Sequence, residues 1–518
     1  MRCTGIECRT SFAGGYGILL FITLLAVGCE KPDAPKPVPE HITIAFPEGD
    51  GASGDTGASQ VASSLSTEGL TFINLDGRVV GRLASEWQWL EGGRQLLVTL
   101  RPNIKLHNDQ KFDAQLAASI LAELSRQASS RMQYPGLADI ESVTAKSEYE
   151  LLFTLSRPSW WLPEDLTIPL KLGKNPGYAT GPYRVVQSGD SSIVLERFDA
   201  YHQGMPGIKT VTVRPESTLR TAWASLLRGN VGMVADLPPD TVELIRNESV
   251  RIISFPRGYQ YMVGLSGRSS KLADPRIRQA LNMAIDRTAL VTSVLKGFGA
   301  PATGPVWYRN WAYDTSAGNI PYAPARAMEL LNEVGLPVKP SPDPTLPPAR
   351  LRLTCLVPEG FIVYEHLALE VQRQLAAVDI DLRFDVQPVK TYTQRMSTGD
   401  FETAIVDLVS GPGLSRASVF WRSPKKPDVY TSFAYENPET EALFDSLREA
   451  TSEADVRSAT RSLQEAFKRN PPAIFLAWNE RARAVPGDFQ ISVERDTDPL
   501  PNLWQWGTNS SAQQVTAR

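Results

Sequence analysis

The fold class is decided by residues 351–409, "LRLTCLVPEGFIVYEHLALEVQRQLAAVDIDLRFDVQPVKTYTQRMSTGDFETAIVDLV". Apolar runs rich in branched residues predict strands at Leu351–Val357, Ile380–Val386 and Phe401–Val409. Between them, apolar residues at helical spacing predict helices at Tyr364–Val378 and near Tyr392–Thr398. Strands that alternate with helices in this way are typical of α/β folds, so we predict an α/β protein.

The composition of the whole chain is that of a globular protein with more than one domain. It has 518 residues, of which 42% are hydrophobic and 21% are charged, and its formal net charge is -4. Charges of both signs are interspersed, and no long basic run is present. We therefore predict no nucleic-acid partner.

The N-terminal segment is typical of an export signal. Arg2 and Arg9 precede the apolar run Ile18–Val27, which is too short to span a bilayer. Gly28-Cys29 follows at once and resembles the end of a bacterial lipoprotein signal, although Ala26 stands where a larger aliphatic residue is usual. We predict a signal peptide over 1–28, lipidation of Cys29 and a Pro-rich tether over 29–40. A soluble secreted protein that is cut nearby is the alternative.

Cysteine and histidine usage argues against redox and metal chemistry. Processing would leave only Cys29 and Cys355, so no disulfide framework is expected, and the apolar context of Cys355 predicts a buried structural thiol. None of the four histidines (His41, His107, His202 and His366) has a metal-ligand spacing. We predict no metal and no cofactor. No nucleophile elbow, phosphate loop or dinucleotide fingerprint is present, so we predict a protein that is not an enzyme.

Several ordered segments resemble one family, the extracellular solute-binding proteins of family 5. The family includes oligopeptide-, dipeptide- and nickel-binding lipoproteins of ABC importers. The resemblance covers about His41–Trp506. It rests on "EGLTFINLDGRVVGRLASEWQW" (68–89), "LLVTLRPNIKLHNDQKFDA" (96–114), "ATGPYRV" (179–185) with "IVLERFDAYHQGMPGIKTVTVRP" (193–215), "LADPRIRQALNMAIDRTALVTSVLKGFGAPATGPV" (272–306) and "EVQRQLAAVDIDLRFDVQPVKTYTQRMSTGDFETAIVDL" (370–408).

The resemblance implies a two-lobed periplasmic-binding-protein fold of the class II, cluster C type with a reduced extra domain. Lobes of this kind enclose a ligand when they close about a hinge. The implied boundaries are 41–75, 179–265 and 480–507 for lobe I, 76–178 for the extra domain and 266–479 for lobe II. The polar tail 508–518 is expected to be disordered.

The implied ligand site includes the loop that follows the strand Phe401–Val409. In peptide binders of the family an aspartate in this loop pairs with the α-amino group of the ligand, whereas Gly411 occupies that register here. Asp407 could supply the carboxylate if its side chain faces the ligand. The expected ligand-lining residues are Tyr261, Trp307, Leu408, Ser410, Gly411, Arg416 and Trp421. Arg416 with Arg422, Lys425 and Lys426 would either attract an anion or form a solvated basic loop.

The predicted function is a monomeric, membrane-anchored receptor that faces the periplasm or the cell exterior. It would capture a small solute, peptide-like or other, and deliver it to an ABC transporter permease, with the lipid membrane as its third partner. Two alternatives stay open. One is a transporter-independent sensor or chaperone-like surface lipoprotein on the same scaffold. The other is an exported hydrolase, because carboxylate pairs can always be assembled from 57 acidic residues.

Overall fold

The computed structural model describes residues 37–47, 57–171, 179–189, 191–238, 242, 249–341, 343–423, 425, 430–491 and 496–507. The chain divides into two compact units, Met1–Pro35 and Lys36–Arg518, and everything described below belongs to the second. The predicted signal peptide (1–28), Cys29, most of the tether and the tail (508–518) lie outside the described residues.

The α/β alternation predicted for 351–409 is confirmed. Its elements are β14 (Leu351–Pro358), α10 (Ile362–Ala376), β15 (Ile380–Gln387), α11 (Val389–Thr398) and β16 (Thr403–Val409). β14 pairs in parallel with both β15 and β16, as crossover helices require. α10 buries Leu367, Val371 and Leu375, which are spaced four residues apart, against this sheet.

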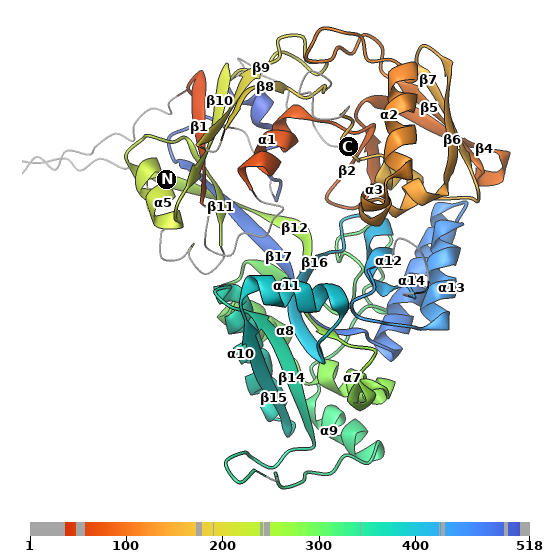
Figure 1. Cartoon of the computed structure of the whole chain (residues 1–518), viewed down its shortest axis with the longest axis vertical. Coiled ribbons are helices and arrows are strands. Elements are labelled where there is room, and N and C mark those ends of the chain that lie inside the picture. The colour runs from red at the N-terminus through yellow and green to blue at the C-terminus, as the bar shows by residue number, and fades with distance from the viewer. Residues whose placement is uncertain are drawn as a thin grey trace, which may run out of the picture. The chain divides into compact units, whose positions relative to one another are not determined.

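One sheet runs through most of the described residues, in the order β15-β14-β16-β12-β17-β11-β1-β10-β9-β8 (Figure 1). The two longest strands, β12 (Val250–Leu265) and β17 (Ala473–Pro486), pair with each other in its middle. The last part of β17 pairs with β11 and with the first part of β12, whereas the second part of β12 pairs with β16. β12 and β17 therefore connect the two parts of the sheet. The remaining strands are β1 (His41–Pro47), β8 (Tyr183–Gly189), β9 (Ser192–Arg197), β10 (Thr210–Glu216), β11 (Met233–Leu237) and β13 (Gly299–Pro301), which pairs with β17.

A separate four-stranded antiparallel sheet occupies the region predicted as the extra domain. Its order is β4 (Ala84–Leu90), β5 (Gln95–Leu100), β7 (Glu150–Leu155) and β6 (Ile140–Ser147). Asp113 caps the N-terminus of α2, as its sequence context predicts, because its side chain accepts a hydrogen bond from Leu116 N at 2.9 Å. The accompanying elements are α2 (Ala114–Arg126), α3 (Ala128–Gln133), η3 (Pro135–Asp139), α4 (Leu162–Asp165), β2 (Thr71–Ile73), β3 (Val79–Gly81) and η2 (Glu91–Gly93).

The other helices cover the large sheet and its extensions. They are α1 (Ala58–Ser66), α5 (Leu219–Leu227), α7 (Pro275–Met283), α8 (Arg287–Ser293), α9 (Pro324–Glu333), α12 (Ser415–Trp421), α13 (Pro438–Arg448) and α14 (Glu453–Arg469), with short η4 (Ser270–Leu272) and η5 (Leu503–Gln505). Cys355 on β14 is fully buried among apolar side chains, and this burial raises the pKa of its thiol to about 12. The prediction of a structural cysteine is confirmed.

Candidate ligand-binding site

The loop after β16 is held against β12 by backbone contacts. The amides of Ser410 and Gly411 both donate to the carbonyl oxygen of Gly258, at 2.8 and 3.0 Å. A Cβ atom on Gly258 would overlap the carbonyl group of Gly411, so only glycine permits this approach. The loop that the sequence marks as a break is thus a tight backbone junction with β12.

The other side of the same loop is also occupied by protein. The Trp307 ring lies against Gly411, and its Nε1 donates to the carbonyl oxygen of Leu75 at 2.8 Å. Asn310 Nδ2 donates to the carbonyl oxygen of Pro412 at 2.9 Å. Gly411 therefore presents its backbone to neighbouring side chains of the same molecule.

A small cavity lies against β12 and β17, near the end of the pairing between β17 and β11. Its volume is about 180 Å³, and its walls come from β1, α1, β11, β12, β17 and residues 498–500. Three guanidinium groups line it, those of Arg257, Arg481 and Arg483, together with the carboxylates of Asp236 and Asp498. We call this the hinge cavity. Its lining includes Phe46 and Asp236, which lie near the C-terminal ends of the parallel strands β1 and β11, and open α/β sheets bind ligands at such ends.

The hinge cavity carries unpaired positive charge. Arg483 donates to both carboxylate oxygens of Asp498, at 2.6 and 2.7 Å. Arg481 is only loosely paired, because its Nη1 lies 3.6 Å from Asp236 Oδ2 and its buried Nε has no hydrogen-bond partner among the described residues. Buried donors of this kind normally have an acceptor, so the cavity lacks an acceptor that a ligand could provide.

Arg257 is the guanidinium group of the hinge cavity that is best placed to bind an anion. Its guanidinium stacks on the Tyr259 ring at 4.4 Å, and within the described part of the chain it makes no hydrogen bond or ion pair. Burial, followed by repulsion from Arg481, lowers the pKa of Arg257, which nevertheless keeps its charge at neutral pH. A half-buried guanidinium without an acceptor costs free energy that a bound carboxylate or phosphate would recover.

A carboxylate stands on the adjoining strand, beyond these arginines. Asp407 lies on β16 opposite Tyr261 of β12, and it accepts a hydrogen bond from the Tyr364 hydroxyl at 2.6 Å. The rings of Tyr364 and Tyr261 meet edge to face at 6.1 Å. The negative charge of Asp407 acts to raise the pKa of Arg257 and of Arg481, so it lies within electrostatic reach of both guanidinium groups. The site thus offers cationic, anionic and aromatic groups in one region, which suits a zwitterionic ligand.

Comparison with known proteins decides the family. Residues 78–426, more than half of the chain, match the family model "Bacterial extracellular solute-binding proteins, family 5 Middle". The chain belongs to this family. The resemblance that the sequence motifs carry is confirmed.

Its similarity to relatives is distant but extensive. It is 24% identical over 445 residues to the glutathione-binding protein GsiB of Pectobacterium atrosepticum, an alignment that spans 81% of this chain and 84% of that relative. It is 28% identical over 299 residues to GsiB of Escherichia coli K12, which spans 55% of this chain and 58% of that relative.

Solved structures of other family 5 proteins share the fold. NikA from Brucella suis, solved with Fe(III)-EDTA, superposes with a TM-score of 0.75 at 18% identity, covering 89% of this chain and 99% of that one. AppA from Bacillus subtilis, solved with a nonapeptide, superposes with a TM-score of 0.71 at 19% identity, covering 91% of this chain and 99% of that one. The predicted two-lobed α/β fold is therefore confirmed.

In this family 5 protein the residues predicted to line the ligand site do not all lie together. Trp307, Ser410 and Gly411 come together at the junction with β12, and all three are buried. Trp421 is fully enclosed by the rings of Phe433, Tyr435 and Phe475.

The remaining predicted residues lie on separate elements. Leu408 is buried in the same apolar cluster as Trp421. Arg416 lies over the Tyr134 ring at 4.7 Å. Tyr261 is buried beside Tyr364 and accepts a hydrogen bond from Asn479 at 3.0 Å.

The basic segment around Arg422 is not a free cationic surface. Arg422 is 6% exposed and donates to Glu441 and Asp445, at 3.2 and 2.6 Å. Lys425 pairs with Glu436 at 3.2 Å, and Lys426 lies outside the described residues. These arginine and lysine side chains are therefore engaged with carboxylates of the same molecule.

Two of the histidines make the structural contacts that the sequence predicts. His202 Nε2 lies 3.0 Å from Glu68 Oε2, and His107 Nε2 lies 2.9 Å from the carbonyl oxygen of Gly181, so both have the structural contacts that were predicted. In the described part of the chain, no group of three or more His, Cys, Asp or Glu side chains is arranged to hold a metal ion. No helix among these same residues has the length and apolar character needed to cross a membrane.

Two buried carboxyl groups hold the loop to α4. Glu164 Oε2 accepts from the amides of Leu414 and Ser415, at 2.8 and 3.0 Å, and Asp165 accepts from the Ser415 hydroxyl at 3.0 Å. Burial raises the pKa of Glu164 and of Asp165 to about 7. The hydrogen bonds from Leu414 and Ser415 oppose this shift at Glu164, and the nearby Arg416 and the Ser415 hydroxyl oppose it at Asp165. At a pH above the ordinary pKa of a carboxyl group, the unfolded chain has released these protons. The folded protein still binds them, because its Glu164 and Asp165 have a higher pKa.

This arrangement predicts a pH-dependent stability. Between about pH 5 and 7 the folded state holds more protons than the unfolded state, so the free energy of unfolding falls as pH rises, by up to about 1.4 kcal/mol per pH unit for each group. Thermal unfolding at pH 5 to 8 should show this decline, and a Glu164→Gln/Asp165→Asn double variant should show a flatter one. Glu141→Gln, which changes an exposed carboxyl group, is the control. Equal slopes in the wild type and the double variant would contradict the assignment.

Proposed function

We propose that the protein is the membrane-anchored receptor of an ABC importer and that it captures a small solute bearing a carboxylate or similar anionic group. Membership of the family supports the receptor role. The observation that carries the ligand class is Arg257, a half-buried guanidinium that faces the hinge cavity with no acceptor among the described residues. Similarity to relatives named as glutathione-binding proteins agrees with it, because glutathione is a zwitterion with two carboxylates.

In this proposal the ligand lies over β12 and β17 and is enclosed when the two lobes close. Lobe I would comprise 41–75, 179–265 and 480–507, and lobe II would comprise 266–479. Arg257 and Arg481 would hold the anionic end of the ligand through guanidinium forks. Closure removes the ligand from water and strengthens each of these contacts.

Asp407 would hold a cationic group of the same ligand. Its side chain is partly exposed and is oriented by the Tyr364 hydroxyl. Asp407 thereby supplies the carboxylate that Gly411 lacks, so a short peptide with a free amino group fits the proposal. Of the residues expected from the sequence, Tyr261 is the one we propose to line the ligand, together with Tyr364.

The function can be tested by identifying what the protein retains on purification. Protein purified from its native host would be denatured, and the released small molecules identified by mass spectrometry. Reduced glutathione and short peptides would then be titrated into ligand-free protein by calorimetry. We expect a carboxylate-bearing solute to be released or to bind. Recovery of an uncharged solute, with no binding of anionic probes, would refute the ligand class.

The anchor has its own test. We propose that Cys29 is lipidated, so palmitate labelling of the wild type in a bacterial host should be lost in Cys29→Ala, and the variant should move to the soluble fraction. Cys355→Ala is the matched control, because its thiol is buried and should not affect labelling. Equal labelling of the wild type and Cys29→Ala would rule out the anchor.

A further inference from the structure

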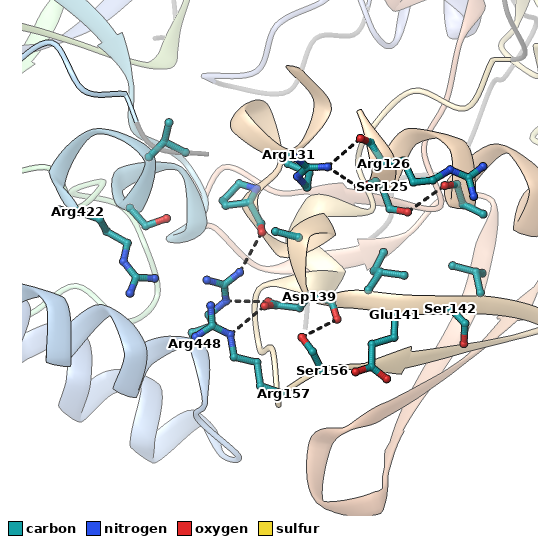
Figure 2. Close-up of a pocket in the computed structure, with 17 residues that line it drawn as sticks. Ser125, Arg126, Arg131, Asp139, Glu141, Ser142, Ser156, Arg157, Arg422 and Arg448 are labelled. Carbon is teal, nitrogen blue, oxygen red and sulfur yellow. Dashed lines mark hydrogen bonds and ion pairs between the residues drawn. The ribbon is translucent and has the colours of Figure 1, made fainter. Parts of the chain in front are cut away.

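Carboxylates hold several of the buried or half-buried arginine side chains of this protein in place. At the pocket drawn in Figure 2, Arg157 and Arg448 converge on Asp139, to which they donate at 3.0 and 2.7 Å. In the hinge cavity, Arg483 donates to both carboxylate oxygens of Asp498. Charge-assisted hydrogen bonds of this kind fix the direction of a guanidinium group.

Arg257 is held in a different way. Its guanidinium lies 4.4 Å from the centre of the Tyr259 ring, and it donates no hydrogen bond to any described residue. A long side chain of this type has many rotamers when nothing restrains it. Within the described residues, the stack on Tyr259 is therefore the contact that limits the orientation of Arg257.

The two residues lie in an irregular part of β12. The pairing of β12 with β17 is regular up to Pro256 and resumes at Gln260, so the three residues 257–259 stand opposite a single residue of β17, Asn479. Extra residues in one strand of a pair bend that strand and change where its side chains point. This bulge is where β12 presents Arg257 to the hinge cavity.

Tyr259 is the anchored end of the bulge. Its backbone pairs with Val409 of β16, and that pairing begins at this residue. The preceding residue, Gly258, accepts hydrogen bonds from two amides of the loop that follows β16. Tyr259 itself is not among the described residues that line the hinge cavity. An effect of its ring on a ligand there would consequently act through Arg257.

We propose that Tyr259 is a positioning residue, whose ring holds the Arg257 guanidinium in the orientation that binds the anionic group of the ligand. This inference rests on the function proposed above, which assigns that group to Arg257. Stacking covers one face of the guanidinium and leaves its N–H edges free for a carboxylate. A side chain that is already ordered loses less entropy on binding, so the ring raises affinity without contacting the ligand.

The test is a double-mutant cycle on Tyr259 and Arg257. Reduced glutathione and trialanine are the probes, titrated calorimetrically into ligand-free protein. Tyr259→Leu removes the ring and should weaken binding about tenfold, which is within the range of a partly desolvated cation–π contact. Tyr259→Phe keeps the ring and should bind within about twofold of the wild type. In an Arg257→Gln background, Tyr259→Leu should cause less than about twofold further loss, because the group that it positions is absent.

The background comparison separates positioning from a general structural role. Damage to the fold would weaken binding equally with and without Arg257, whereas positioning would not. Tyr322→Leu, which changes an exposed tyrosine, is the matched control and should leave the affinity unchanged. Thermal unfolding of each variant reports its stability, and Tyr259→Met serves as a second ringless variant if Tyr259→Leu does not fold.

Three outcomes would overturn this inference and leave the proposed ligand class intact. They are equal affinity in the wild type and Tyr259→Leu, equal losses in the two backgrounds, and a loss in Tyr259→Phe as large as that in Tyr259→Leu. Failure of the wild type to bind either probe is a separate result, and it would overturn both the inference and the proposed ligand class.

Discussion

An Arg257→Gln variant is expected to bind a carboxylate-bearing ligand about 100-fold more weakly than the wild-type protein. Hydrogen bonds to a charged group contribute about 1.5–3 kcal/mol, and the upper part of that range corresponds to this loss. The effect should be large because Arg257 has no acceptor of its own within the described residues. Its donors are therefore not engaged by the protein and are available to the ligand.

The same variant should fold at least as well as the wild type. Among the described residues Arg257 forms no ion pair that the substitution would break, and repulsion by Arg481 acts on it more strongly than attraction by Asp236 or Asp407. Removing one of three neighbouring positive charges relieves that repulsion. An affinity loss without a stability loss would assign Arg257 to recognition and not to structure.

The measurement is calorimetric titration of the ligand identified by mass spectrometry, with reduced glutathione as the first probe, beside thermal unfolding of each variant. Arg257→Lys keeps the charge but not the fork, so its affinity should fall between those of the wild type and Arg257→Gln. Arg220→Gln is the matched surface control. An unchanged affinity in Arg257→Gln would remove the basis for the proposed ligand class.

Gly258→Ala should produce the largest stability loss, about 3 kcal/mol or more. The added methyl group would overlap the Gly411 carbonyl, which is backbone and cannot rotate away as a side chain could. Relief of this overlap requires β12 and the loop to separate, which breaks the two hydrogen bonds from Ser410 and Gly411 to Gly258. The cost of overpacking is thus added to the cost of lost hydrogen bonds.

Chemical denaturation of Gly258→Ala beside Gly304→Ala measures this effect. Gly304 has no atom within 4 Å of the position that its Cβ would take, so the control should remain close to the wild type. A Gly258→Ala protein within about 0.5 kcal/mol of the wild type would show that the loop does not depend on this contact.

Local periodicity predicted the elements of 351–409 because that signal is contained within each segment. The helix predicted at Tyr364–Val378 is observed as Ile362–Ala376, and the strand predicted from Phe401 begins at Thr403. The loop at Gly411 was also visible as a break in the pattern. Its surroundings were not, because Gly258, Trp307 and Glu164 reach it from distant segments. No local pattern encodes contacts of that kind.

The hinge cavity was not predicted from the sequence, for a related reason. Arg257 and Tyr261 lie in "FPRGYQYMVGL", where strand alternation would place them on one face. However, the pairing of β12 with β17 shifts register between Pro256 and Gln260, and alternation fails across such an irregularity. The available signal was the presence of arginines in two strand-like segments. Arg257 lies in one of them, and Arg481 and Arg483 lie in the other. Only the pairing of the two strands shows that they share a cavity.

The hydrogen bonds that Glu164 accepts from Leu414 and Ser415 join the predicted extra domain (76–178) to the predicted lobe II (266–479). This contact, between α4 and the start of α12, lies far along the chain from the pairing of β12 with β17. In the lobe closure proposed above, the extra domain would therefore travel with lobe II for as long as these hydrogen bonds persist. Loss of the Glu164 contact would allow the extra domain to move separately.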